Sequence, residues 1–299
     1  MEEQYTQHLH RLHQLQLYCR HRVDHQLSGL YQSVFKGQGI EFDEVRTYVP
    51  GDDVRSIDWN ITARTGQVHI KRYHEERQLN LIFVVDNSPS FAWSSEDVNR
   101  QEVAAKLCGL LGAVALGNND RLGLLKFSDG IDQYLPPANG YSQLMRCLDA
   151  ILQNPQPVTT TSIIQSLEHL NQLKLKRSMI VIISDFFFDD FMESLAVLNR
   201  HHEVLALAID DPREKALNHG GLIQLKDAET GQQQWLDLSS KPVRESFREQ
   251  GDQRMVYRTR QFSDRGIDLI CHSLSDDPVE TLLSYFLTRK HRVAGETGG

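Results

Sequence analysis

Short apolar segments that alternate with helical ones are the feature that most restricts the fold of this chain. From Leu79 onward, LIFVV, RLGLLKF and MIVIIS are apolar at nearly every position, and the segments between them have apolar residues at helical spacing. A strand that is apolar on both sides must be covered on both sides, as in a parallel sheet with crossover helices. The sequence therefore predicts a doubly wound, mostly parallel α/β domain over residues 79–292.

Three shorter segments flank this domain. Residues 1–28 have apolar residues at helical spacing and predict one polar N-terminal helix. In residues 29–78, Gly, Pro and Asp separate short alternating runs, which predicts a small β-rich subdomain. Residues 293–299, which end in AGETGG, predict a disordered tail.

The bulk properties of the chain set limits on its function. It has 299 residues and a formal net charge of −8, which argues against binding to nucleic acid or an anionic membrane along the whole chain. No apolar run approaches the roughly 20 residues that cross a bilayer, and the N-terminus lacks the pattern of a signal peptide. The four cysteines form no C-x-x-C pair. We therefore expect a reduced, cytoplasmic protein without membrane insertion.

Oxygen-bearing side chains gather where the predicted strands end. Asp86 follows one apolar strand and Asp185 follows another, while Ser88 and Ser90 come directly after Asp86. Ligands of doubly wound sheets bind beyond the carboxyl ends of the strands. Two carboxylates there would repel each other unless a divalent cation lay between them. Together with the hydroxyl of Thr161, which opens a later helix, this donor set suits Mg²⁺ or Mn²⁺.

A purely structural interpretation of the same residues remains open. Ser88 and Ser90 could cap a helix while Asp86 accepts hydrogen bonds from backbone amides. A separate pair, His21 and His25, is spaced by one helical turn, but no third ligand is evident. We interpret the histidines as a solvated helix face.

The pattern D-x-S-x-S after a strand, with a later Thr and a later Asp, resembles the metal-ion-dependent adhesion site of von Willebrand factor type A domains. The resemblance implies that five residues surround the cation, namely Asp86, Ser88, Ser90, Thr161 and Asp185. It further implies that the hydroxyls touch the metal, that the carboxylates bind it directly or through water, and that a carboxylate from a partner often completes the octahedron.

A second resemblance covers most of the chain. The segments GQGIEF, RTYVPGDDVRSIDW and ARTG look like the signature of an uncharacterised bacterial family, domain of unknown function (DUF) 58. This resemblance implies a von Willebrand A-like, Rossmann-type domain after the signature, and a MoxR-type AAA+ ATPase as partner. The sequence departs from the family pattern at Phe91 and Thr160, and neither departure removes a ligand.

The signature residues themselves permit two interpretations. In the first, acidic and basic residues form an ion-pair network that ties the subdomain to the sheet, with Trp59 as a buried anchor; its members are Asp52, Asp53, Arg55, Asp58 and Arg64. In the second, Arg55, Trp59 and Arg64 form a partner-binding patch, since these residue types are enriched at binding hot spots. We favour the first.

The function expected from these features is metal-dependent protein binding, as an adaptor between a MoxR-type ATPase and client proteins. The alternative is a Mg²⁺-dependent phosphoryl-transfer enzyme, which would need a second carboxylate where Ser88 stands and a lysine near the pocket. The chain lacks a P-loop and the common hydrolase motifs, so we expect no enzymatic activity. Residues 241–260 carry many arginines, but interleaved acids favour a salt-bridged surface over nucleic-acid binding.

Overall fold

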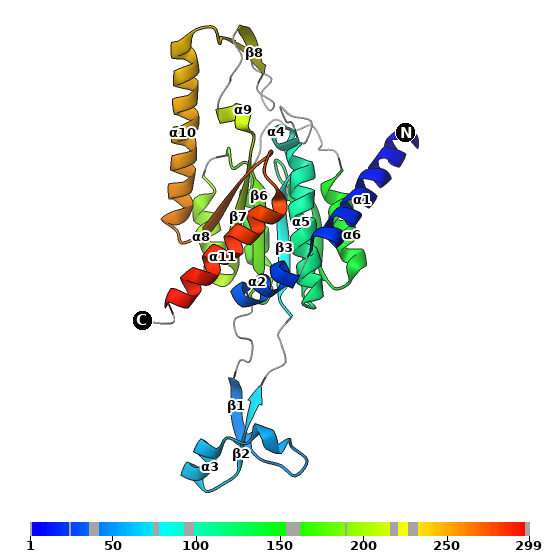
Figure 1. Cartoon of the computed structure of the whole chain (residues 1–299), viewed down its shortest axis with the longest axis vertical. Coiled ribbons are helices and arrows are strands. Elements are labelled where there is room, and N and C mark those ends of the chain that lie inside the picture. Colours follow the sequence, from blue (N-terminus) through cyan, green and yellow to red (C-terminus); the bar gives the residue numbers. More distant parts are fainter. Residues whose placement is uncertain are drawn as a thin grey trace.

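The computed structural model describes residues 2–23, 25–35, 42–73, 78–92, 99–153, 162–188, 190–215, 221–226 and 233–296. A six-stranded sheet forms its centre, in the order β10-β7-β6-β3-β4-β5 (Figure 1). Its strands are β3 (Asn80–Asp86), β4 (Arg121–Phe127), β5 (Ile131–Ala138), β6 (Met179–Ser184), β7 (Glu203–Asp210) and β10 (Asp268–Ser273). All neighbouring pairs are parallel except β4 and β5. The predicted mostly parallel α/β architecture is confirmed.

Helices cover both faces of this sheet, because alternate residues of the central strand enter two different cores. Phe83 of β3 packs into a cluster with α1 (Glu2–Arg22), α2 (His25–Phe35), α5 (Arg100–Gly117), α6 (Tyr141–Ile151) and α11 (Pro278–Glu296). Val84 packs into the opposite cluster, with α7 (Ile164–Gln172), α8 (Met192–His201) and α10 (Lys241–Ser263). The apolar character of β3 on both sides follows from this arrangement.

Edge strand β5 was not predicted. It contains Pro136 and Pro137, which cannot donate ladder hydrogen bonds and therefore occur at the edges of sheets. It pairs with β4 alone, in antiparallel register with irregularities. The prolines hide the strand from a sequence pattern, while its edge position tolerates them.

The N-terminal segment forms two helices instead of the single expected one. The second, α2, extends to Phe35 and buries Leu27 and Tyr31 in the sheet domain. The hydroxyl of Tyr31 donates a hydrogen bond to Asp120 at 3.1 Å. The expected boundary at residue 28 therefore shifts, because residues 29–35 continue a helix of the main domain. The exposed His21 and His25 lie on different helices.

The signature subdomain is a small module, residues 42–73, which Figure 1 shows apart from the sheet. It consists of β1 (Phe42–Thr47), the short helix η1 (Val54–Ser56), α3 (Trp59–Thr65) and β2 (His69–Tyr73), and β1 pairs with β2 in antiparallel register. Two of its acids are helix caps. The carboxylate of Asp53 accepts from Arg55 N at 2.9 Å, and that of Asp58 accepts from Asn60 N at 2.9 Å.

The interpretation of Trp59 as a buried anchor is wrong, since its side chain is 69% exposed. Among the expected network residues, Asp52 forms an ion pair with Arg46, at 2.7 Å, within the module itself. The cap supplied by Asp58 fixes α3 locally, and the indole faces solvent.

The C-terminal part agrees with the sequence pattern in its elements. Strands β8 (Leu222–Lys226) and β9 (Gln233–Asp237) pair in antiparallel register, and α10 carries ion pairs spaced by four residues, such as Lys241–Glu245. Helix α11 begins after Asp277, whose carboxylate accepts from Val279 N at 2.8 Å. It continues to Glu296, past the expected start of the tail. Within the described residues, no helix has both the length and the apolar character needed to cross a membrane.

Candidate metal centre at the carboxyl edge of the sheet

The strand order reverses its direction at β3, near the edge where the parallel strands end. Strand β3 lies between β4 and β6, so the chain leaves β3 on one side and later returns on the other. Such a reversal is the usual ligand-binding position in open α/β sheets. Asp86 is the last residue of β3, and Asp185 directly follows β6. Since β3 and β6 pair in parallel, both carboxylates come from adjacent strands, as predicted.

The loop after β3 holds its oxygen atoms in a fixed arrangement. Asp86 is 2% exposed; its Oδ1 accepts from Ser88 N at 2.8 Å, and its Oδ2 accepts from Ser184 Oγ at 2.6 Å. The hydroxyls of Ser88 and Ser90 lie 3.0 Å apart. Ser88 Oγ also accepts from Phe91 N at 3.3 Å, within the short helix α4 (Pro89–Ala92). The capping contacts of the structural interpretation are present, and they place the two hydroxyls together.

The environment of Asp185 is unfavourable for a charged carboxylate. It is 3% exposed, and its Oδ1 accepts a hydrogen bond from Phe187 N at 3.1 Å. Burial, and next the charge of Asp86, raise the pKa of Asp185 to about 7, although nearby arginines act in the opposite direction. The two carboxylates therefore repel each other, as expected of a pair that a cation could share.

Two buried arginines complete the charge balance, and no sequence pattern distinguishes them from the other arginines. Arg100 Nη1 lies 3.9 Å from Asp185 Oδ2. Arg258 Nη1 donates to the backbone oxygen of Asp185 at 2.8 Å, and its Nη2 donates to Asp210 at 2.7 Å. In the sequence, Arg258 is one of many arginines of a charged helix. Only its burial distinguishes it.

A further hydrogen-bond network attaches the loop after β3 to the turn between β4 and β5. Asn87 Nδ2 and Ser128 Oγ each donate to the carboxylate of Asp132, both at 2.6 Å. The backbone oxygen of Ser128 accepts from Ser162 N at 2.8 Å. Thr161 lies outside the described residues. Its neighbour Ser162 is at the same edge of the sheet, as the interpretation of Thr161 requires.

The candidate metal ligands at the carboxyl edge are all oxygen atoms. Within the described ranges, no three or more His, Cys, Asp or Glu side chains gather so that they could hold a metal ion. The candidate donors here are two carboxylates and two hydroxyls.

Lys126, near the end of β4, is a buried lysine that the sequence reasoning overlooked. Its Nζ donates to Ala150 O at 2.5 Å, at the carboxyl end of α6, and burial lowers its pKa to about 8. The lysine is therefore engaged with a helix terminus.

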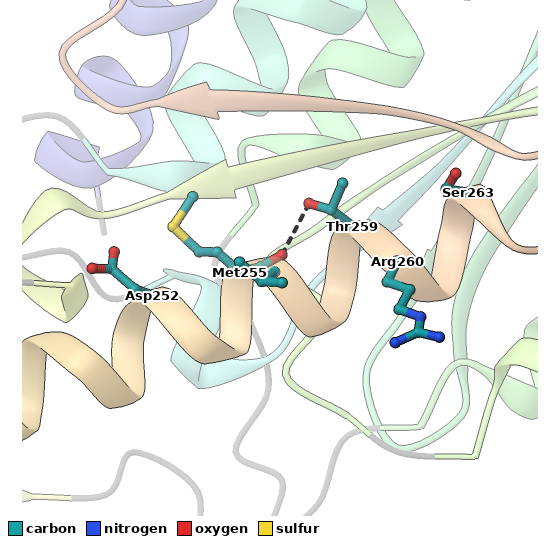
Figure 2. Close-up of a pocket in the computed structure, with 6 residues that line it drawn as sticks. Asp252, Met255, Thr259, Arg260 and Ser263 are labelled. Atoms are coloured by element: carbon teal, nitrogen blue, oxygen red, sulfur yellow. Dashed lines mark hydrogen bonds between the residues drawn. The ribbon is translucent and has the colours of Figure 1, made fainter.

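The patch proposed for partners lies elsewhere on the molecule. Arg55, Trp59 and Arg64 are all exposed on the 42–73 module, and Figure 1 shows that this module is apart from the carboxyl edge. A hollow of about 580 Å³ runs along α10 and is lined by residues of that helix, including Met255 and Thr259 (Figure 2). None of the predicted site residues lines this hollow.

Comparison with known proteins places this α/β chain, with its acidic carboxyl edge, in a family. The model of the family described as "Protein of unknown function DUF58" matches residues 44–256. Uncharacterised proteins of Mycobacterium bovis and Mycobacterium tuberculosis are each 31% identical over 223 residues, which cover 74% of this chain and 70% of theirs. The chain belongs to the DUF58 family.

Solved structures with a similar arrangement include the hypothetical protein BatB from Bacteroides thetaiotaomicron. It is 15% identical with a TM-score of 0.43, over 72% of this chain and 99% of that one. The pilus adhesin SpaC from Lactobacillus rhamnosus GG, in its open conformation, is 13% identical with a TM-score of 0.40, over 74% of this chain and 30% of that one.

Proposed function

We propose that this protein is a divalent-cation-dependent protein-binding module with a von Willebrand A-like, Rossmann-type domain. The observation that carries the proposal is the pair of buried carboxylates at the ends of adjacent strands, Asp86 and Asp185, beside two hydroxyls 3.0 Å apart. The adaptor role toward a MoxR-type AAA+ ATPase rests on the family resemblance of the signature. Client proteins would then be held at the carboxyl edge.

The donor chemistry fits a hard cation. Asp86, Ser88, Ser90 and Asp185 offer only oxygen, which suits Mg²⁺ or Mn²⁺, and Thr161 is the proposed fifth donor. A bound cation would offset the repulsion between the two carboxylates and would offer a position to a carboxylate of the partner.

The residues around the donors orient the two carboxylates. Ser184 Oγ fixes Asp86 through Oδ2, and Phe187 N fixes Asp185 through Oδ1. Each carboxylate thus keeps one orientation on a rigid strand end, which a cation with near-octahedral demands requires. The exposed patch of Arg55, Trp59 and Arg64 is proposed as a second contact, for the ATPase.

The phosphoryl-transfer alternative has less support. Ser88 occupies the position of the second carboxylate, and Lys126, the buried lysine at a strand end, donates to the terminus of α6. Purified protein should therefore leave ATP and simple phosphate esters intact with any metal. Hydrolysis that disappears in Asp86→Asn would favour the enzyme instead.

Calorimetric titration with Mg²⁺ or Mn²⁺ tests the metal centre. Wild type should bind one ion per chain, and Asp86→Ala should lose this binding while it remains folded. Asp120→Asn is the matched control, because Asp120 is also buried but accepts from Leu79 N at the opposite edge of the sheet. Equal binding by wild type and Asp86→Ala would refute the site.

Affinity capture with Mg²⁺ and with EDTA tests the partner. An AAA+ ATPase or a client should be retained with Mg²⁺, released by EDTA, and lost in Ser88→Ala. Ser166→Ala serves as the control, since the buried hydroxyl of Ser166 has no hydrogen-bond partner among the residues that the structure describes. If Trp59→Ala abolishes capture of the ATPase while Ser88→Ala does not, the module carries that contact alone.

A further inference from the structure

A fully buried arginine joins three segments around the carboxyl edge. Arg100 is the first residue of α5, and its side chain is 1% exposed. Its Nε donates to Ile209 O at 3.1 Å, at the end of β7, and its Nη1 donates to Ser90 O at 3.2 Å. Its Nη2 pairs with the carboxylate of Glu214 on the short helix α9 (Pro212–Lys215). The guanidinium is therefore fixed in position.

This position places a permanent positive charge beside one of the candidate ligands. Arg100 Nη1 is 3.9 Å from Asp185 Oδ2, and both groups are buried, so their attraction is weakly screened. A divalent cation between Asp86 and Asp185 would be repelled by the same guanidinium. Glu214 opposes that repulsion, because its carboxylate pairs with Arg100 on the other side.

Resting on the proposed metal centre, we propose that Arg100 is the counter-cation of Asp185 in the metal-free protein, and that the Arg100–Glu214 pair sets the affinity of the centre for divalent cations. With a cation bound, the carboxylate of Asp185 would interact with the metal instead of with Arg100. Arg100 keeps its contacts with Ser90, Ile209 and Glu214. The loop after β3, the end of β7 and helix α9 thereby become linked to occupancy of the centre.

Charge, not size, is the property that this role requires. Arg100→Gln removes the charge, whereas Arg100→Lys keeps the charge but loses the forked hydrogen bonding. Glu214→Gln removes one of the acids that offset the positive charge of Arg100, and leaves Asp185 and Asp211. Glu193→Gln on α8 removes an exposed carboxylate and controls for a general loss of negative charge.

The test is calorimetric titration of the full-length chain with Mg²⁺ and with Mn²⁺. Arg100→Gln should bind about tenfold more tightly than wild type, and Glu214→Gln should bind about tenfold more weakly. Arg100→Lys and Glu193→Gln should remain near wild type. If Arg100→Gln fails to fold, the Glu214→Gln and Glu193→Gln pair decides the question.

The outcomes separate this inference from the proposed function. If wild type binds the ion and all variants bind it equally, the inference is overturned and the metal centre stands. If Arg100→Gln binds and wild type does not, the inference is supported and metal dependence of the native protein is refuted. If no variant binds, both are overturned.

A double-mutant cycle of Arg100→Gln with Asp185→Asn, in EDTA, gives a readout without metal. The two changes should not have additive effects on the unfolding equilibrium, and additive effects would overturn the pairing.

Discussion

The carboxyl edge of the sheet and the 42–73 module use charged residues in opposite ways. At the edge, Asp86, Asp185 and Arg100 are almost fully buried, and each has partners on other segments. In the module, the charged side chains of Asp53, Arg55 and Arg64 are exposed. Buried charges must be paired to be tolerated, so the edge is fixed by its own electrostatics. The module instead presents its side chains to solvent.

This difference shows that the most distinctive motif of the chain is not a core motif. RTYVPGDDVRSIDW forms the end of β1, a turn, the capped helix η1 and the start of α3, and its Trp59 is exposed. Exposed tryptophan flanked by arginines is typical of a hot spot at an interface. The carboxyl edge can hold a charged group in a defined geometry, whereas the module can offer an exposed surface for protein binding.

The strongest test of this difference between the two regions is to remove one arginine from each. Arg258→Ala should lower the free energy of unfolding by about 3 kcal/mol, because it leaves Asp210 without its buried partner at 2.7 Å. Arg64→Ala, at an exposed position of α3, should change it by less than about 0.5 kcal/mol. Urea denaturation measures both. Equal losses would mean that the module is as integrated as the edge.

The pH dependence of stability is a second test of the difference between the carboxyl edge and the module. The pKa of Asp185 is about 7 in the folded protein, against about 3.9 for an aspartate in an unfolded chain, so the folded state binds a proton that the unfolded chain releases between these values. The free energy of unfolding of metal-free protein should therefore fall, by on the order of a few kcal/mol, as pH rises from 4 to 7.

Asp185→Asn should remove this fall and be more stable than wild type at pH 8, in denaturant titrations with EDTA. Asp53→Asn in the module should keep the wild-type pH profile. A wild-type curve that is flat, relative to Asp185→Asn, would show that the edge carboxylates do not repel each other.

The smallest expected effect is local to the module. Asp58→Ala removes the N-cap of α3 and should destabilise that helix by about 1 kcal/mol. Hydrogen exchange should accelerate at the amides of α3, while the amides of β3 keep their protection. Loss of protection in β3 as well would show that the module and the sheet unfold as one unit.

Local signals explain why much of the fold was predictable. The apolar runs that became β4 and β6 match the structure residue for residue, because strands buried on both faces are apolar at nearly every position. Edge strand β5 escaped detection since its prolines resemble a turn. The break between α1 and α2 has no proline or glycine to mark it. Trp59 was misplaced because an aromatic residue is usually, but not always, buried.

The sequence by itself determined which residues end the buried strands, and therefore that Asp86 and Asp185 stand at the carboxyl edge of a parallel sheet. Periodicity over a few residues suffices for that inference. Only the tertiary structure decided that β3 is adjacent to β6, and that Arg100 reaches the carboxylate of Asp185, and Arg258 its backbone oxygen, from distant helices. Those contacts join residues far apart in the chain. Their energies depend on burial and distance, which no local pattern records.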